Sequence, residues 1–109
     1  MPASPLWLDI VRHQVRGFRA PYLLVIQHHD LPATTRIVAP VTPPLPGDID
    51  VLAPRLSVNG KEHRARLLDT AAVPLRLLGE TISSASGDRD AIMSALDIIL
   101  HGYPAGRPS

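Results

Sequence analysis

The chain has 109 residues, of which 45% are hydrophobic and only 4% aromatic, and it contains no cysteine. This length predicts one domain with a modest core, and the lack of cysteine excludes disulfides and thiolate metal sites. Eleven basic and ten acidic residues leave a formal net charge of +1, so the chain lacks the broad positive surface that drives nucleic-acid binding.

Neither an export signal nor a membrane-spanning segment is predicted. The apolar cluster Leu6-Trp7-Leu8 near the N-terminus is too short for the core of a signal peptide, and Asp9 follows it at once. No apolar run approaches the roughly 20 residues that span a bilayer. We therefore expect a cytoplasmic protein with no membrane partner.

Five short segments predict β-strands, because they are rich in β-branched and large apolar residues and are bounded by turn-forming residues. They are residues 6–11, 22–27, 35–41, 55–58 and 62–68. The twelve prolines argue against a helical bundle, and those at positions 40, 43, 44 and 46 predict a loop that ends at Gly47. Asn59-Gly60 favours a type I′ turn, since both residues tolerate positive φ, and thus predicts a hairpin over 55–68.

The second arm of this hairpin alternates in polarity. We expect one face to be solvated and the other covered, because successive side chains of a strand point to opposite faces. The solvated set is Glu62, Arg64 and Arg66, and the covered set is His63, Ala65 and Leu67. On the covered face, His63 is predicted to be packed or hydrogen-bonded.

From Ser86 onward the periodicity becomes helical. Ser86, Asp88 and Asp90 are typical of a helix start. Apolar residues then recur at helical spacing at Ile92, Ala95, Leu96, Ile99 and Leu100, opposite a polar stripe of Asp90, Ser94 and Asp97. The apolar arc also includes Met93 and Ile98 and is wider than one sheet face needs, so we predict a homodimer with Met93 and Ile98 at its interface. Alternatively, these two residues lie under the proline-rich loop.

Five histidines raise the question of a metal site. No pair has the spacing of a shared ligand face on a helix, and adjacent His28 and His29 would point to opposite sides of a strand. We expect these histidines to be surface loop residues. We therefore predict no metal ligands and no cofactor.

The order of these elements, with the residues that separate them, resembles the CcdB family. The matching segments are 22–27, 35–41, the run LDTAAVPLRLLGE over 68–80, and the helix 89–100 followed by Gly102 and Tyr103. The resemblance implies a mainly β fold, namely an SH3-like small antiparallel barrel or sheet with a C-terminal α-helix, in a symmetric dimer. It implies a single domain over 1–103, and we expect residues 104–109 to form a disordered tail.

The resemblance also implies a function, which is that of the toxin in a type II toxin-antitoxin module. Such a toxin binds the DNA gyrase A subunit, traps the complex of gyrase with cleaved DNA, and is neutralised by a cognate antitoxin. It acts by binding and not as an enzyme, so no catalytic residues are expected. The gyrase-binding end of the helix maps to His101, Gly102 and Tyr103, together with Asp97 and Leu100. The best-known member has a tryptophan where this chain has His101.

Arg64, Arg66 and Arg76 are candidates for binding an acidic antitoxin segment, provided that all three are exposed. Two other functions stay open. One is a MazF-like ribonuclease toxin, which needs a basic groove and an arginine beside a serine or threonine. The other is a homologue that binds an antitoxin-like partner without poisoning any target.

Overall fold

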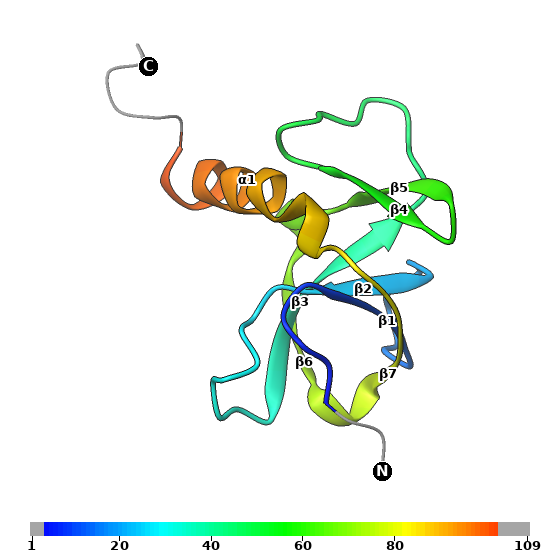
Figure 1. Ribbon diagram of the computed structural model, residues 1–109, viewed down its shortest axis with the longest axis vertical. Helices are drawn as coiled ribbons and strands as arrows, with labels where there is room; N and C mark the ends of the chain where they lie inside the picture. The colour runs from blue at the N-terminus through cyan, green and yellow to red at the C-terminus, as the bar shows by residue number, and fades with distance from the viewer. Residues whose placement is uncertain (1–3, 103–109) are drawn as a thin grey trace.

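Figure 1 shows the computed structural model of the protein, which describes residues 4–102. The strands of this part of the chain are β1 Asp9–His13, β2 Tyr22–Val25, β3 Thr35–Thr42, β4 Arg55–Val58, β5 Lys61–Ala65, β6 Ala71–Pro74 and β7 Leu78–Ser84. Three 3₁₀ turns, η1 Leu67–Asp69, η2 Leu75–Leu77 and η3 Ser86–Asp88, connect the later elements and lead into the helix α1, Arg89–His101.

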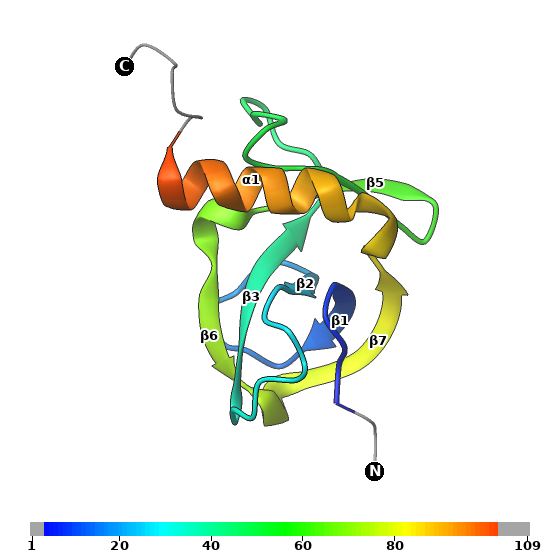
Figure 2. The same cartoon turned by 60° about the vertical axis from the view of Figure 1, so that its left-hand side comes forward.

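One antiparallel sheet contains all these strands, in the order β4-β5-β3-β2-β1-β7, with β6 paired separately to β3. The long strand β3 makes this arrangement possible. Its C-terminal end pairs with β5 through Val41 and Ala65, and its N-terminal half pairs with β6 through Arg36 and Val73. The sheet curls into a half-barrel with α1 across one end (Figure 2), so the predicted fold class is confirmed.

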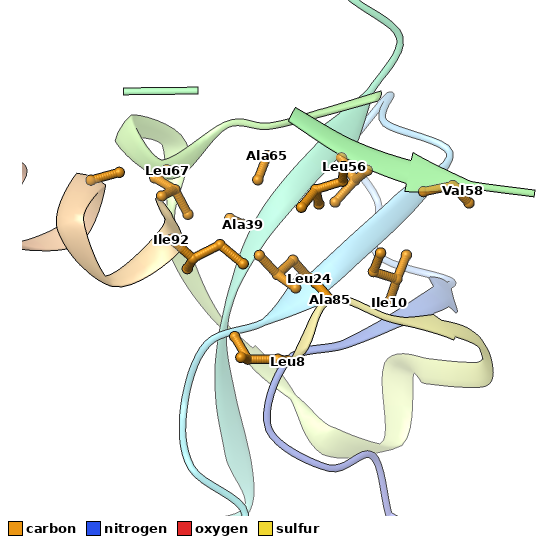
Figure 3. Close-up of a cluster of buried hydrophobic side chains, with 12 residues drawn as sticks. Leu8, Ile10, Leu24, Ala39, Leu56, Val58, Ala65, Leu67, Ala85 and Ile92 are labelled. Carbon is orange, nitrogen blue, oxygen red and sulfur yellow. The ribbon is translucent and has the colours of Figure 1, made fainter. Parts of the chain in front are cut away.

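Both faces of the central strands are buried, because each face packs against a separate core. The main core lies below α1 (Figure 3) and consists of Leu8, Ile10, Leu24, Ala39, Val41, Leu56, Val58, Ala65, Leu67, Ala85, Ile92 and Ala95. The second core lies on the other face and consists of Val11, Leu23, Val25, Val38 and Val73. Neighbouring residues of one strand, such as Leu23 and Leu24, thus belong to different cores, which explains the continuous apolar run in β2.

The β4–β5 hairpin forms as predicted. Asn59 and Gly60 have φ values of 53° and 78°, and Val58 pairs with Lys61 across the turn. His63 is buried, and its Nδ1 lies 3.1 Å from the Lys61 carbonyl oxygen. The prediction that Arg64 lies on the solvated face is wrong, because Arg64 is only 6% exposed. The loop between β3 and β4 covers that face.

Several element boundaries differ from the predictions. The first strand begins at Asp9, because Leu6 to Asp9 form a turn in which Leu8 adopts a φ of 67°. Strand β5 ends at Ala65, where η1 begins a new turn with the Asp69 N–H bonded to the Arg66 carbonyl at 3.0 Å. Strands β6 and β7 were not predicted.

The pairing of β1 with β7 is irregular. Its register shifts between Ile10 and Val11 and again between Val11 and His13. Such bulges add backbone to one strand of a pair and increase its local bend and twist. They help the sheet to curl at this edge.

Helix α1 packs on the main core through Ile92 and Ala95, which are buried, and through the half-buried Leu96 and Ile99. The helix starts at Arg89, and Asp88 at its N-cap makes no side-chain capping bond. Within residues 4–102, no helix is long and apolar enough to cross a membrane.

Candidate functional site

The C-terminal end of α1 presents an exposed face to solvent. Asp97, Leu100 and His101 are related by helical steps of three and four residues and therefore lie on one face. All three are exposed, and Leu100 is 71% exposed. The structure thus brings together three of the predicted gyrase-binding residues, with Leu100 at one edge of this face and the two polar residues beside it.

Gly102 ends this face with an unusual backbone conformation. Its φ and ψ of 77° and −168° belong to a region that only glycine occupies without strain. Its N–H donates to the Ile98 carbonyl at 2.8 Å, which closes the last turn of the helix. Tyr103 and the predicted tail 104–109 lie outside the described residues.

The two predicted dimer residues are not on one surface. At 100° per residue, Met93 and Ile98 are about 140° apart around the helix. Met93 is 41% exposed, so the proline-rich loop does not cover it, whereas Ile98 is half-buried. Met93 instead aligns with Leu100, which follows it by two turns. Together they form an apolar strip beside Asp97, and η1, which packs against α1, carries the 65% exposed Leu68.

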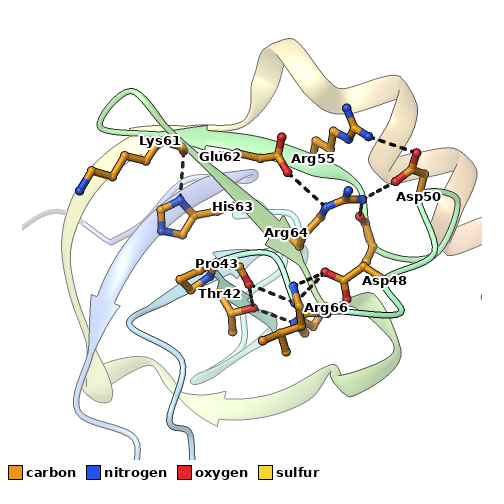
Figure 4. A network of polar contacts seen from close by, with 12 residues as sticks. Thr42, Pro43, Asp48, Asp50, Arg55, Lys61, Glu62, His63, Arg64 and Arg66 are labelled. Atoms are coloured by element: carbon orange, nitrogen blue, oxygen red, sulfur yellow. Dashed lines mark hydrogen bonds and ion pairs between the residues drawn. The ribbon is translucent and has the colours of Figure 1, made fainter.

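Arg64 is engaged in intramolecular contacts (Figure 4). Its Nη1 donates to Asp50 Oδ1 at 2.6 Å and to the Ala53 carbonyl at 3.0 Å. Asp50 also forms an ion pair with Arg55, at 3.6 Å. The hydrogen bond from Arg64 lowers the pKa of Asp50, with a further contribution from the charge of Arg55, and the same bond raises the pKa of Arg64.

Arg66 is similarly occupied. Both of its terminal nitrogens donate to the Asp48 carboxylate, its Nε donates to Thr42 Oγ1 at 2.8 Å, and Nη2 also reaches the Pro43 carbonyl at 3.2 Å. The bonds from Arg66, followed by the one from the Leu45 N–H, lower the pKa of Asp48 from 3.8 to about 2. Arg64 and Arg66 therefore fasten the loop between β3 and β4 to β5.

Arg76 has a different setting. It is exposed on η2, which lies at the end of the molecule away from the β3–β4 loop (Figures 1 and 2). The three arginines do not form one basic patch. The condition that all three be exposed is met by Arg76 alone, because Arg64 is buried and the side chain of Arg66 is only 15% exposed.

A groove beside Arg76 was missing from the sequence-based expectations. It has a volume of about 760 Å³ and is lined by Ser4, Pro5, Ala33, Thr34, Thr35, Pro74, Leu75, Arg76, Leu78 and Gly79. Against its wall lies Arg36, which is only 5% exposed and donates through Nη1 to the carbonyls of Ala33 and Thr35. The one available signal was an arginine inside the otherwise apolar segment 35–41.

His28 and His29 lie in an exposed loop, as predicted. They follow β2 in a loop, and their rings stack with centroids 4.3 Å apart. With Asp30 they place three ligand atoms within 4.8 Å of one another. Each Nδ1 accepts a backbone N–H, from Asp30 and from Trp7 respectively, both at 3.1 Å. These bonds occupy ring lone pairs that a metal would need, which favours a structural role for the loop.

Comparison with known proteins identifies a matching family and a similar solved structure. The model of the CcdB protein family matches residues 9–102, whereas no curated protein matches the sequence. The crystal structure of an Mtb toxin is similar, with a TM-score of 0.63 and 17% identity over 86% of this chain and 99% of that chain. At this identity, the likeness supports the fold alone. The family match spans almost all of the described structure, and the chain belongs to the CcdB family.

Proposed function

We propose that this protein is the toxin of a toxin-antitoxin module and that it acts by binding the A subunit of DNA gyrase with the C-terminal end of α1. Membership of the CcdB family supports the toxin role. The observation that carries the target site is the exposed face of Asp97, Leu100 and His101, which ends at Gly102.

This face has the chemistry of a protein-binding surface. Leu100 is a large apolar side chain that gains free energy when a partner covers it, at about 25 cal/mol per Å² of buried apolar area. The carboxylate of Asp97 and the imidazole of His101 lie on one side of it around the helix and supply directional polar contacts. The closed last turn at Gly102 holds these groups in a fixed arrangement before any partner binds.

With histidine at position 101, we expect weaker binding to gyrase than with tryptophan. An imidazole offers a smaller aromatic face than an indole to a partner guanidinium, and it repels that guanidinium when protonated. Replacing His101 with tryptophan should therefore strengthen gyrase binding by about 2- to 30-fold.

A cleavage assay tests the target directly. Purified protein is incubated with gyrase and supercoiled DNA, and the linear DNA released by detergent and protease is measured. We expect linear DNA with the unmodified protein, more with His101→Trp, and none with Leu100→Glu. Ser94→Trp is the matched control, because Ser94 lies two turns earlier on the same side of the helix and is also exposed.

The outcomes separate the competing functions. Growth arrest without linear DNA would contradict the gyrase target, and site-specific fragments of a long RNA would then favour a ribonuclease toxin. If expression arrests no growth but a neighbouring small protein still co-purifies, the chain is a binding homologue that poisons nothing.

We further propose that the active form is a homodimer. The exposed Met93 on α1 and the exposed Leu68 on η1, which contacts α1, support this assembly, since exposed apolar residues on neighbouring elements favour association. Ile98 stays a predicted interface residue on the other flank of α1. Sedimentation equilibrium is expected to show a dimer that Met93→Lys weakens, and an unmodified protein that is monomeric at micromolar concentration would contradict the proposal.

The antitoxin is the second expected partner. Of the three arginines predicted to bind it, Arg76 offers an exposed guanidinium, whereas Arg64 and Arg66 would first have to exchange Asp50 and Asp48 for antitoxin carboxylates. Suppression of growth arrest by co-expression of a neighbouring short reading frame identifies this partner. Its affinity should fall with added salt if carboxylates carry the binding.

A further inference from the structure

The groove described above opens where the half-barrel is not closed. Strand β6 pairs with β3 and strand β7 pairs with β1, but β6 and β7 do not pair with each other. The turn η2 joins them at one end, and the groove lies along this junction. Its lining is largely apolar, with Pro5, Ala33, Pro74, Leu75 and Leu78 as the apolar residues.

Arg36 places a buried positive charge against this groove. It faces the second core beside Val73, its register partner in β6. Its Nη1 donates to the Ala33 carbonyl at 2.9 Å and to the Thr35 carbonyl at 3.0 Å, and both residues line the groove. Its Nε is buried without a hydrogen-bond partner within residues 4–102.

Arg36 lacks a carboxylate partner of the kind that Arg64 and Arg66 have. Those two arginines are paired with Asp50 and Asp48, whereas the described residues offer Arg36 only carbonyl oxygens. A carbonyl is a dipole and does not neutralise a guanidinium, and a buried charge without a counter-ion is costly. A carboxylate brought by a partner would supply the missing negative charge.

We propose that this groove binds an extended segment of the antitoxin that combines apolar side chains with a carboxylate. The carboxylate pairs with Arg36 from within the groove, the exposed Arg76 draws acidic residues to the rim, and the apolar side chains cover Leu75 and Leu78. This inference rests on the proposed toxin function for the identity of the partner, but its chemistry is independent of gyrase.

The lining argues for a peptide over a nucleic acid. A phosphate backbone needs several exposed cations along its path, whereas Arg76 is the one charged residue that residues 4–102 contribute to the lining of the groove. An extended peptide, in contrast, can use the free edges of β6 and β7 for backbone hydrogen bonds and place alternate side chains on the apolar floor.

Two probes test the inference. The first is the neighbouring protein that suppresses growth arrest. The second is a synthetic peptide of alternating leucine and glutamate, compared with its leucine–glutamine counterpart by isothermal titration calorimetry. We expect the glutamate peptide to bind about 10- to 100-fold more tightly than the glutamine peptide, because it makes charge-assisted hydrogen bonds.

Variants of the groove then locate the site. Arg36→Met keeps a long apolar stem but removes the charge, and it is expected to reduce the preference for the glutamate peptide to about twofold or less. Leu75→Glu should abolish binding of both the antitoxin and the glutamate peptide, since it adds a repelling charge to the floor. Arg55→Gln is the matched control, because it removes an exposed arginine from β4, outside the groove.

Each outcome decides the inference or the function separately. If the antitoxin neutralises the toxin and Arg36→Met and Leu75→Glu bind it unchanged, the groove is not its site although the toxin function stands. If no neighbouring protein neutralises growth arrest, the antitoxin part of the proposed function fails, and equal binding of the two peptides would overturn the groove as well. Displacement of the glutamate peptide by an RNA oligonucleotide would reassign the groove to nucleic acid.

Should Arg36→Met fail to fold, the variants Leu75→Glu and Arg76→Gln test the groove in its place.

Discussion

Arg66 binds Asp48 with both terminal nitrogens of its guanidinium, across 18 residues of chain. Asp48 belongs to the proline-rich loop between β3 and β4, and Arg66 directly follows β5. The contact fixes the loop without any regular secondary structure within it, because a two-pronged pair constrains both position and orientation. Loss of either partner is thus expected to release the loop.

Stability should depend on pH through Asp48. Its pKa in the folded protein is about 2, below its ordinary value of 3.8. A carboxyl group with a lowered folded pKa stabilises the fold above its unfolded pKa and loses this contribution as the pH falls toward the folded value. We therefore expect the urea midpoint of the unmodified protein to exceed that of Asp48→Asn at pH 6, and the gap to shrink between about pH 4 and 2.

The control for this titration is Glu80→Gln. Glu80 pairs with Arg12 at 3.5 Å on the surface, where its side chain is 72% exposed. Exposed pairs contribute little to stability, so the midpoint of this variant should follow the unmodified protein at every pH. A constant gap between Asp48→Asn and the unmodified protein down to pH 2 would contradict the assigned role of Asp48.

The arginines should separate into structural and surface residues. Arg64→Gln breaks the bonds to Asp50 and to the Ala53 carbonyl and leaves Asp50 only its longer ion pair with Arg55, so it should lower the urea midpoint. Arg76→Gln, at an exposed position, should change the free energy of unfolding by no more than about 0.5 kcal/mol. Equal midpoints for the two variants would show that the loop does not depend on Arg64.

The turn at Gly60 gives a third prediction. An added Cβ would meet no atom within 4 Å, so the cost of Gly60→Ala comes from its φ of 78° alone and should be about 1 kcal/mol. Gly87→Ala is the control, because Gly87 also has open space around it but does not have a positive φ. Chemical denaturation of both variants measures the difference, and similar losses at the two sites would argue against the left-handed turn.

Two adjacent residues of α1 should behave differently. Ile92 is fully buried in the main core, so Ile92→Ala should lower the free energy of unfolding by about 2–5 kcal/mol. Met93→Ala should leave the unfolding of the dilute monomer nearly unchanged and should weaken self-association instead, since Met93 is exposed. Calorimetry at several protein concentrations measures both effects, and a concentration-independent loss at Met93 would place it in the core.

Elements with strong local signals could be predicted from the sequence. The β4–β5 hairpin depends on Asn59-Gly60, and α1 depends on the regular spacing of Ile92, Ala95 and Ile99. Strands β6 and β7 escaped prediction because their sequences carry weak β-propensity, with Ala71-Ala72 in one and Gly79-Glu80 in the other. Long-range pairing with β3 and β1 forms them.

The candidate site could likewise be predicted only in part. The exposed face at the end of α1 followed from helical spacing and from the family resemblance. Arg64 was predicted to face solvent and Arg36 was not considered, because a charged residue in a strand is normally expected on the solvent-facing side. Arg64 is buried by the loop that carries its acidic partner, Asp50, which lies 14 residues away in sequence. A pattern of neighbouring residues cannot reveal a contact over that separation.

The irregular register between β1 and β7 means that this edge of the sheet depends on the exact length of both strands as well as on their residue types. Adding or removing a single residue near Val11 or Thr81 would move every following side chain of that strand to the opposite face. A one-residue deletion there would remove a bulge and straighten this edge of the half-barrel.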